Sequence, residues 1–305
     1  MSKSKDLFSF EGYAIPLPLL MATGGGPDTF SVISETHIRN ITETCGLGPG
    51  MNVLEIGCGI GRDAIPLTKI LGPNDSYLGI DIIRDSINWC SSNISRRHSN
   101  FRFLHFDIKD QLHNPGGTFK TADLPIPLEN SGTDLIILQS VFTHMFERDI
   151  VFYLQEFRRV LRPNGRIYAT CFIVDPLVLR SARATNLTQY DLSFKFSVGR
   201  GCYINNPEVP AGAVAYEYDA ICRMVRRAGL LPAQDYLRGG WSGLYENTKD
   251  GQDVLILKPK TDSVPSHEII DAQEAYLGAI EKRLDASEPH YDGTPLPRPT
   301  KWKLW

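Results

Sequence analysis

Three glycines at alternate positions form the pattern with the clearest chemical meaning. Gly57, Gly59 and Gly61 follow a short apolar run, and Glu55 precedes them by two residues. Glycine lets the backbone approach a ligand closely, and the start of a helix favours anionic or carboxylate groups. In the dinucleotide-binding fingerprint G-x-G-x-x-G, the third glycine would fall at Arg62. The glycines therefore predict a ligand-binding turn from strand to helix, and Arg62 disfavours a nicotinamide dinucleotide as the ligand.

Three polar residues follow the ends of later apolar runs. Asp81 follows the second run, where an acid can accept hydrogen bonds from both hydroxyls of a ribose. Asp107 follows the third run, and His144 comes shortly after the fourth. Ligands of open α/β sheets bind where such strands end, and an imidazole that titrates near neutral pH suits a general base. These residues therefore predict that a ligand binds at the edge of the sheet where the strands end, and that a side chain there can act as a general base.

The order of these motifs resembles that of class I (Rossmann-like) methyltransferases that use S-adenosylmethionine (SAM) and act on small molecules. The pattern Glu-x-Gly-x-Gly-x-Gly at 55–61 is similar to motif I of that family. Residues 156–165, Glu-x-x-Arg-Val-Leu-Arg-Pro-Asn-Gly, resemble the family's segment Glu-x-x-Arg-Val-Leu-Lys-Pro-Gly-Gly. Asn164 replaces the first glycine there, and Asn also adopts a left-handed turn. The resemblance covers residues 36–258 and implies a SAM-dependent methyltransferase, a transferase enzyme.

The resemblance also implies which residues bind SAM. Asp81 would bind the ribose and Asp107 the amino group of adenine. Ile82, together with Phe106 or Ile108, would pack against the adenine ring. The implied cofactor-binding set is Glu55, Gly57, Cys58, Gly59, Gly61, Asp81, Ile82, Asp107, Ile108 and Gln139.

Several of these residues also fit a purely structural interpretation. The family places Glu55 near the methionine end of SAM, but a buried acid bonded to the backbone fits the same pattern. Asp81 and Asp107 also fit solvated loop acids or helix caps. In the family's reaction a nucleophile attacks the methyl group of SAM in line, and S-adenosylhomocysteine leaves. His144 is the candidate catalytic base, because it lies just past the fourth strand at the open edge of the sheet, where ligands bind. A packing or capping histidine fits that position as well.

The elements that must position these residues alternate between strands and helices. Such alternation predicts βαβ units and a doubly wound, mainly parallel α/β sheet of seven strands. The last two strands have no helix between them, so one strand of a C-terminal hairpin is expected to run antiparallel. The expected strands are 51–56, 76–80, 101–106, 133–139, 166–174, 233–238 and 253–258, and the expected helices are 34–45, 62–71, 86–95, 150–161 and 218–228.

Three regions lie outside this alternation. Residues 1–35 are rich in Gly, Pro and aromatic residues, which predicts an irregular N-terminal arm before a SAM-binding domain at 36–260. Residues 175–217 separate a strand from a helix and carry many aromatic residues, so we expect a substrate lid inserted there. Residues 261–305 contain helical spacing at 268–284 and a Pro-rich tail.

The composition of the chain limits the classes of binding partner and the cellular location that we expect. The 305 residues carry a net charge of −3, so no global field draws the chain to nucleic acid. No apolar run reaches the roughly 20 residues that span a bilayer, so no membrane partner is expected. The first ten residues lack the apolar core of a signal peptide, and the six cysteines are scattered. A reduced, cytoplasmic protein without a metal site is the simplest interpretation.

The acceptor is predicted mainly from motifs that are missing. Residues 139–142 read Gln-Ser-Val-Phe, whereas enzymes that methylate the amines of nucleic-acid bases often carry Asn/Asp-Pro-Pro-aromatic there. We therefore expect a small-molecule or sugar-containing acceptor. The segment Val-Phe-Thr-His-Met at 141–145, with the long insertion after the fifth strand, resembles family members that methylate hydroxyls of sugars and secondary metabolites, which implies methylation on a hydroxyl oxygen. The alternatives are methylation of nitrogen or carbon on a small molecule or macromolecule, a non-catalytic SAM-binding or partner-docking protein, and a nicotinamide-dependent oxidoreductase. The sequence predicts no oligomeric state.

Overall fold

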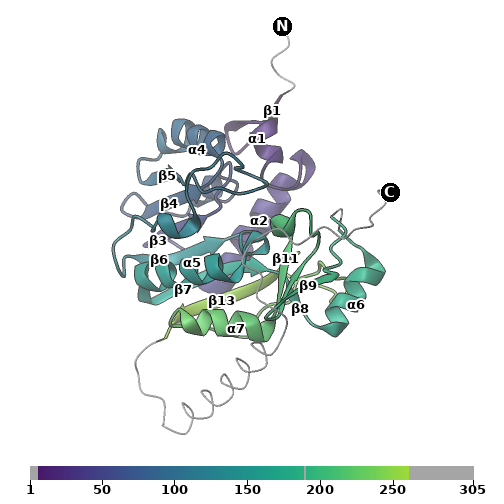
Figure 1. Ribbon diagram of the computed structural model, residues 1–305. Coiled ribbons are helices and arrows are strands. Elements are labelled where there is room, and N and C mark those ends of the chain that lie inside the picture. The colour runs from purple at the N-terminus through teal and green to yellow at the C-terminus, as the bar shows by residue number, and fades with distance from the viewer. Residues whose placement is uncertain (1–5, 189, 261–305) are drawn as a thin grey trace.

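The computed structural model describes residues 6–188 and 190–260 (Figure 1). A seven-stranded sheet forms its centre, in the order β12-β13-β7-β6-β3-β4-β5. Strands β3 to β7 are parallel, whereas β13 runs antiparallel to both of its neighbours. The predicted sheet is confirmed. Its strands are β3 (Asn52–Ile56), β4 (Ser76–Asp81), β5 (Phe101–His105), β6 (Thr133–Leu138), β7 (Leu161–Cys171), β12 (Leu230–Pro232) and β13 (Asp253–Pro259).

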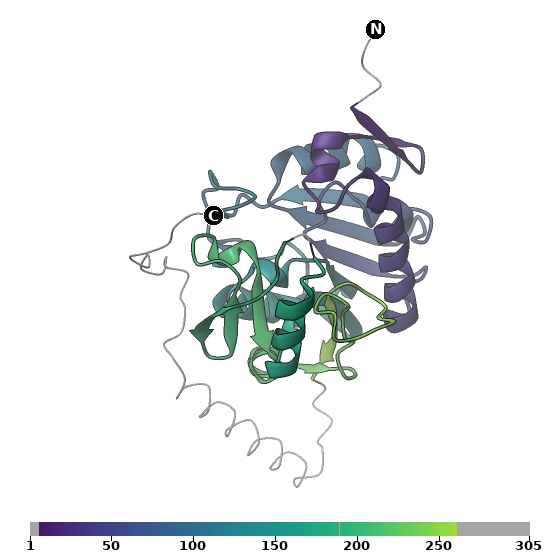
Figure 2. The same ribbon diagram turned by 90° about the vertical axis from the view of Figure 1, so that its right-hand side faces the viewer.

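Helices cover both faces of this sheet (Figure 2). Leu54 and Ile56 belong to a hydrophobic cluster that includes α5 and α7, whereas Val53 belongs to a second cluster with α2 and α3. Successive side chains of a strand point to opposite faces, and a strand that is buried on both faces has a continuous apolar sequence. These helices are α2 (Pro27–Cys45), α3 (Ala64–Leu67), α4 (Arg84–Cys90) with its π-helical extension Ser91–Ser95, α5 (Glu147–Val160) and α7 (Tyr218–Arg227).

The N-terminal residues are more regular than predicted. They form a hairpin of β1 (Leu7–Phe10) and β2 (Tyr13–Pro16), followed by the short helix α1 (Leu17–Met21). The predicted irregular arm is therefore wrong for these residues. Helix α2 also begins seven residues earlier than predicted, because Pro27 occupies its first position, where the fixed backbone angle of proline suits a helix.

The segment between β7 and α7 forms a structure of its own. It contains α6 (Pro176–Thr185), β9 (Phe196–Gly199), β10 (Cys202–Ile204) and β11 (Val214–Glu217). With β8 (Ile173–Val174) these strands form a second sheet in the order β8-β11-β10-β9. A separate hydrophobic cluster, which includes Phe172, Phe194 and Trp241, packs under this sheet. We call residues 175–217 the insertion.

The C-terminal strands differ in part from the prediction. The predicted strand at 233–238 is wrong, because within it Leu237 forms an isolated bridge with Val254 of β13 and Ala233 donates a single hydrogen bond to Ile256. Gly229, in the left-handed conformation at φ 71°, ends α7 and turns the chain directly into β12. The helix and tail predicted for 261–305 lie outside the described residues. Within 6–188 and 190–260, the helices are too short or too polar to cross a lipid bilayer.

Candidate active site

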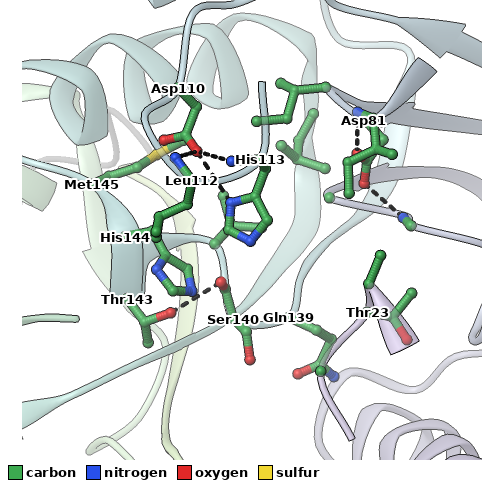
Figure 3. A pocket seen from close by; sticks show the side chains of 18 of the residues that line it. Thr23, Asp81, Asp110, Leu112, His113, Gln139, Ser140, Thr143, His144 and Met145 are labelled. Carbon is green, nitrogen blue, oxygen red and sulfur yellow. Dashed lines mark hydrogen bonds and ion pairs between the residues drawn. The ribbon is translucent and has the colours of Figure 1, made fainter. Parts of the chain in front are cut away.

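A cavity of about 1440 Å³ lies where the parallel strands end (Figure 3). Residues after β3, β4, β5, β6 and β7 all contribute to its lining, and the insertion and the N-terminal residues complete it. A pocket for one drug-sized ligand usually measures about 300–1,000 Å³. The cavity is therefore large enough for two ligands side by side.

The glycine turn after β3 forms part of its wall. Gly57 and Gly59 have positive φ angles of 77° and 51°, which L-residues rarely adopt. A Cβ atom on Gly57 would lie 2.5 Å from the side chain of Val141, and one on Gly59 would lie 2.7 Å from that of Thr23. Both positions therefore require glycine for conformation and for space, and their backbone is exposed to a ligand in the cavity.

Asp81 lies at the end of β4, against this turn. Its side-chain oxygens accept hydrogen bonds of 2.7 Å from the backbone N–H groups of Gly59 and Ile83. Burial raises the pKa of Asp81, while the bonds from Ile83 and Gly59 act in the opposite direction. A carboxylate has about four acceptor positions, so Asp81 can hold the glycine turn and still accept bonds from a ligand.

Glu55 belongs to a buried acidic group at the base of the cavity. The hydroxyl of Tyr77 donates a 2.5 Å hydrogen bond to Glu55. Burial, and next the negative charge of Asp63, raise the pKa of Glu55 well above its ordinary value. Asp63 lies 2.8 Å from Nδ1 of His37, and its other oxygen is buried without a hydrogen-bond partner among the described residues. Sequence reasoning missed His37 and Asp63, which come together only through the packing of α2 on α3.

Other predicted residues line the same half of the cavity. Ile82 and Ile108 contribute apolar surface, and Cys58 lies beside the turn. Burial raises the pKa of Cys58 well above its ordinary value, so its thiol stays protonated. Gln139, at the end of β6, is 8% exposed, and its side-chain nitrogen has no hydrogen-bond partner within the described parts of the chain. A buried donor without a partner indicates a group that a ligand satisfies.

Two residues of the predicted set do not line the cavity, Asp107 and Gly61. The side chain of Asp107 instead accepts a 3.2 Å hydrogen bond from Asn114 in the following loop. A Cβ on Gly61 would meet Ile94 at 2.7 Å, so this glycine serves the packing of the π-helical turn after α4.

His144 lies in the opposite half of the cavity, after β6. Its Nδ1 is 2.9 Å from the carbonyl oxygen of Ala211, in the insertion. A neutral imidazole that donates through Nδ1 keeps Nε2 as an acceptor. Burial lowers the pKa of His144, which favours this neutral form. The geometry therefore gives His144 the protonation state of a base.

A second histidine, which sequence reasoning missed, lies beside it. The rings of His113 and His144 have centroids 5.6 Å apart and planes at 75°. Nδ1 of His113 is 3.1 Å from Asp110, and both residues line the cavity. The spacing Asp-x-x-His in the loop after the third strand is the sequence signal that points to this pair.

The N-terminal residues close the cavity from the side of the glycine turn. The guanidinium of Arg62 donates to the carbonyl oxygens of Thr23 and Gly24, at 3.4 and 3.2 Å. The side chain of Thr23 therefore lies against Gly59. Arg62, which stands where dinucleotide-binding proteins have glycine, fixes this segment instead of approaching a pyrophosphate.

The strand order, with the glycine turn after β3 and the carboxylate at the end of β4, defines the class I fold of SAM-dependent methyltransferases. A family model described as "Methyltransferase domain" matches residues 47–195, and over these residues the chain is similar to that family.

Relatives with names in this class share only part of their length with the chain. A probable phthiotriol/phenolphthiotriol dimycocerosates methyltransferase 2 of Mycobacterium ulcerans (strain Agy99) is 35% identical over 38% of this chain and 37% of its own length. Methyltransferase GfsG of Streptomyces halstedii is 27% identical over 48% of this chain and 47% of its own. The chain thus matches less than half of these relatives. The solved structure of mitomycin 7-O-methyltransferase MmcR aligns over 79% of this chain and 56% of its own, with a TM-score of 0.50 and 14% identity.

Proposed function

We propose that this protein transfers a methyl group from SAM to a hydroxyl oxygen of a small-molecule, glycan or natural-product acceptor. The supporting observation is that a single cavity joins the glycine turn and Asp81 to the base-like nitrogen of His144. The name of one curated relative, a probable phthiotriol/phenolphthiotriol dimycocerosates methyltransferase, also favours a small-molecule acceptor.

The residues of one half of the cavity fit SAM. Gly57 and Gly59 have no side chains, so SAM can contact the protein backbone at these positions. Asp81 has acceptor positions left for the ribose hydroxyls of SAM. Ile82 and Ile108 offer apolar surface for the adenine ring, and the unpartnered amide nitrogen of Gln139 offers a donor. When bound, SAM supplies an electrophilic methyl group on a sulfonium sulfur.

The other half fits the acceptor. His144 removes the proton of the acceptor hydroxyl through Nε2, while its Nδ1–H bond to Ala211 fixes the ring. The insertion acts as a substrate lid, because Leu192, Asn205 and Val209 line this half of the cavity. Holding the two reacting groups together and excluding water supplies much of the acceleration in such displacements.

The first test is calorimetric titration with SAM and S-adenosylhomocysteine, with NAD⁺ as the control ligand. Purified protein is then incubated with SAM and a panel of phenols, sugars and other alcohols, and products are located by mass spectrometry and NMR. We expect micromolar binding of both SAM and S-adenosylhomocysteine and a methyl ether as product. His144→Gln is expected to lower kcat by about 10²–10⁴-fold, the usual contribution of a general base.

His98→Gln is the matched control, because His98 lies beside Phe101 and outside the cavity. Methyl groups found only on nitrogen or carbon would contradict O-methylation. Binding of SAM with no product from any acceptor would favour the non-catalytic interpretation, and binding of NAD⁺ alone would favour an oxidoreductase.

A further inference from the structure

Two imidazoles face the acceptor half of the cavity from different elements. His144 follows β6, and His113 lies in the loop after β5, yet their ring centroids are only 5.6 Å apart (Figure 3). No group of three or more His, Cys, Asp or Glu residues in the described chain has a metal-binding arrangement. Two imidazoles this close together can hold and exchange protons with a group that lies between them.

The two rings are anchored by opposite kinds of group. His144 is held by a neutral carbonyl oxygen, whereas His113 is held by the carboxylate of Asp110. The backbone N–H groups of Leu112 and His113 also donate to that carboxylate oxygen, at 3.0 and 2.7 Å. The loop is therefore built to present a carboxylate to the imidazole of His113, which favours the cationic form of that ring.

The surroundings shift the pKa values of the two histidines in opposite directions. The hydrogen bond to Asp110 raises the pKa of His113, and the nearby charge of Asp81 acts in the same direction. Burial lowers the pKa of His144, and the positive charge of His113 adds to this effect. Lys109, Asp149, Tyr153 and, from the insertion, Tyr190 are further titratable residues of the cavity lining. Neighbouring groups whose pKa values are driven apart are typical of a divided acid–base assignment.

We propose that His113, oriented by Asp110, is a second catalytic residue, whose imidazolium hydrogen-bonds the acceptor oxygen while His144 removes the proton of that oxygen. This inference rests on the proposed function. Asp110 is a positioning residue, because it acts through His113. The proton of the hydroxyl passes to Nε2 of His144. The methyl–oxygen bond forms as the methyl–sulfur bond breaks, and the electron pair of the broken bond stays on sulfur.

This arrangement also selects a class of acceptor. A fixed cation stabilises negative charge that develops on an oxygen, and its effect is largest where the charge is fully formed before transfer. A phenolic hydroxyl, with an ordinary pKa of about 10, and an enolic hydroxyl lose their proton far more readily than the hydroxyls of sugars and alkyl alcohols, so they come closest to that state. His113 and His144 together therefore favour a phenolic or enolic acceptor over a sugar.

A histidine titration tests the pair without any acceptor. NMR of isotope-labelled protein follows each ring from pH 5 to 9. We expect His113 to titrate above the ordinary pKa of about 6.5 and His144 below it. Asp110→Asn should move the pKa of His113 downward, and His113→Gln should move that of His144 upward. The ring signals of His98, which lies beside Phe101 and outside the cavity, serve as the internal reference.

The pH profile of catalysis tests the role. Activity requires neutral His144 and charged His113, so kcat/KM should be highest between their two pKa values. Asp110→Asn should move the alkaline limb of the profile to lower pH, and His113→Gln should remove that limb and lower kcat by about 10²–10³-fold. A merely structural role for Asp110 would lower the unfolding midpoint and leave the limb in place.

The outcomes separate this inference from the proposed function. If no acceptor is methylated, the proposed function fails, and the histidine titration still decides whether the pair exists. A wild-type His113 that titrates at or below the ordinary value, or one that Asp110→Asn does not move, would overturn the inference. A preference for sugar hydroxyls over phenols would also overturn it.

Discussion

At the scale of residues, a carboxylate can bind a ligand in the cofactor half of the cavity only if its side chain faces the cavity, and its place after a strand does not by itself ensure this. Asp81 and Asp107 both follow strands of the same sheet, but only Asp81 lines the cavity. Its oxygens are bound by two backbone N–H groups, which fix the carboxylate and order the glycine turn together. Asp107 is instead bound by Asn114.

This difference predicts unequal effects of two matched substitutions. Asp81→Asn places an amide NH₂ against a backbone N–H group and removes the charge that bonds ribose hydroxyls. We expect affinity for S-adenosylhomocysteine to fall by about 10–100-fold, because hydrogen bonds to charged groups contribute about 1.5–3 kcal/mol. Asp107→Asn should leave the affinity within about twofold. Titration calorimetry measures the affinity of both variants for S-adenosylhomocysteine. If Asp107→Asn loses as much affinity as Asp81→Asn, the result would instead support the adenine contact that the family resemblance implies.

The sequence predicted which strand ends meet, because the buried strands are continuous apolar runs and their order follows from the alternation with helices. It did not predict side-chain directions there. Asn114 binds Asp107 through a loop whose shape only the tertiary structure defines. The same loop brings Asp110 and His113 to the cavity, and the N-terminal residues reach the glycine turn through Arg62. Such contacts between distant segments leave little periodic trace in a sequence.

At the scale of elements, Asp253 joins the main sheet to the second sheet. It is the first residue of β13, and one of its oxygens accepts hydrogen bonds of 2.8 Å from the backbone of Ile173 in β8 and from the ring nitrogen of Trp241. Its other oxygen accepts a 2.9 Å bond from Gly239. Burial raises the pKa of Asp253 to about 6, so the group is charged at neutral pH. One carboxylate thus satisfies three buried donors.

Replacing this carboxylate should weaken the attachment of the second sheet. Asp253→Asn leaves at least one of the three donors facing an NH₂ group, and a buried polar group without a partner costs about 1–3 kcal/mol. We expect the free energy of unfolding at pH 7.5, measured with urea, to fall by about 2–3 kcal/mol. The exposed Asp235→Asn is the control and should change it by less than about 0.5 kcal/mol. Equal values for the two variants would show that these hydrogen bonds contribute nothing net.

At the scale of the whole molecule, the cavity lies between parts of the chain that are far apart in sequence. The N-terminal residues contact the glycine turn on one side, and the insertion covers the other side. A ligand that fills the cofactor half contacts several of these parts together. Its binding free energy therefore adds to the stability of the folded chain as a whole.

The midpoint of thermal unfolding, Tm, should therefore rise when a ligand binds in the cofactor half. S-adenosylhomocysteine at a hundred times its dissociation constant adds about 2.7 kcal/mol, which corresponds to a rise in Tm of about 5 °C for a domain of this size. In Gly59→Arg the new side chain starts at a position 2.7 Å from Thr23, so we expect that rise to disappear. Scanning calorimetry with NAD⁺ as the control ligand completes the test. A rise with NAD⁺ as large as that with S-adenosylhomocysteine would argue against the cofactor assignment.

The second sheet contributes to two hydrophobic clusters, and this has an evolutionary consequence. Val214 and Tyr216 of β11 belong to the cluster of the main sheet, whereas Ala215 between them belongs to the separate cluster with Phe172 and Trp241. Mutations on the first side of β11 therefore reach the central core, whereas mutations on the second side reach only the separate cluster. Related genes can diverge in acceptor preference mainly through the second side, while the half of the cavity that holds the glycine turn is inherited with few changes.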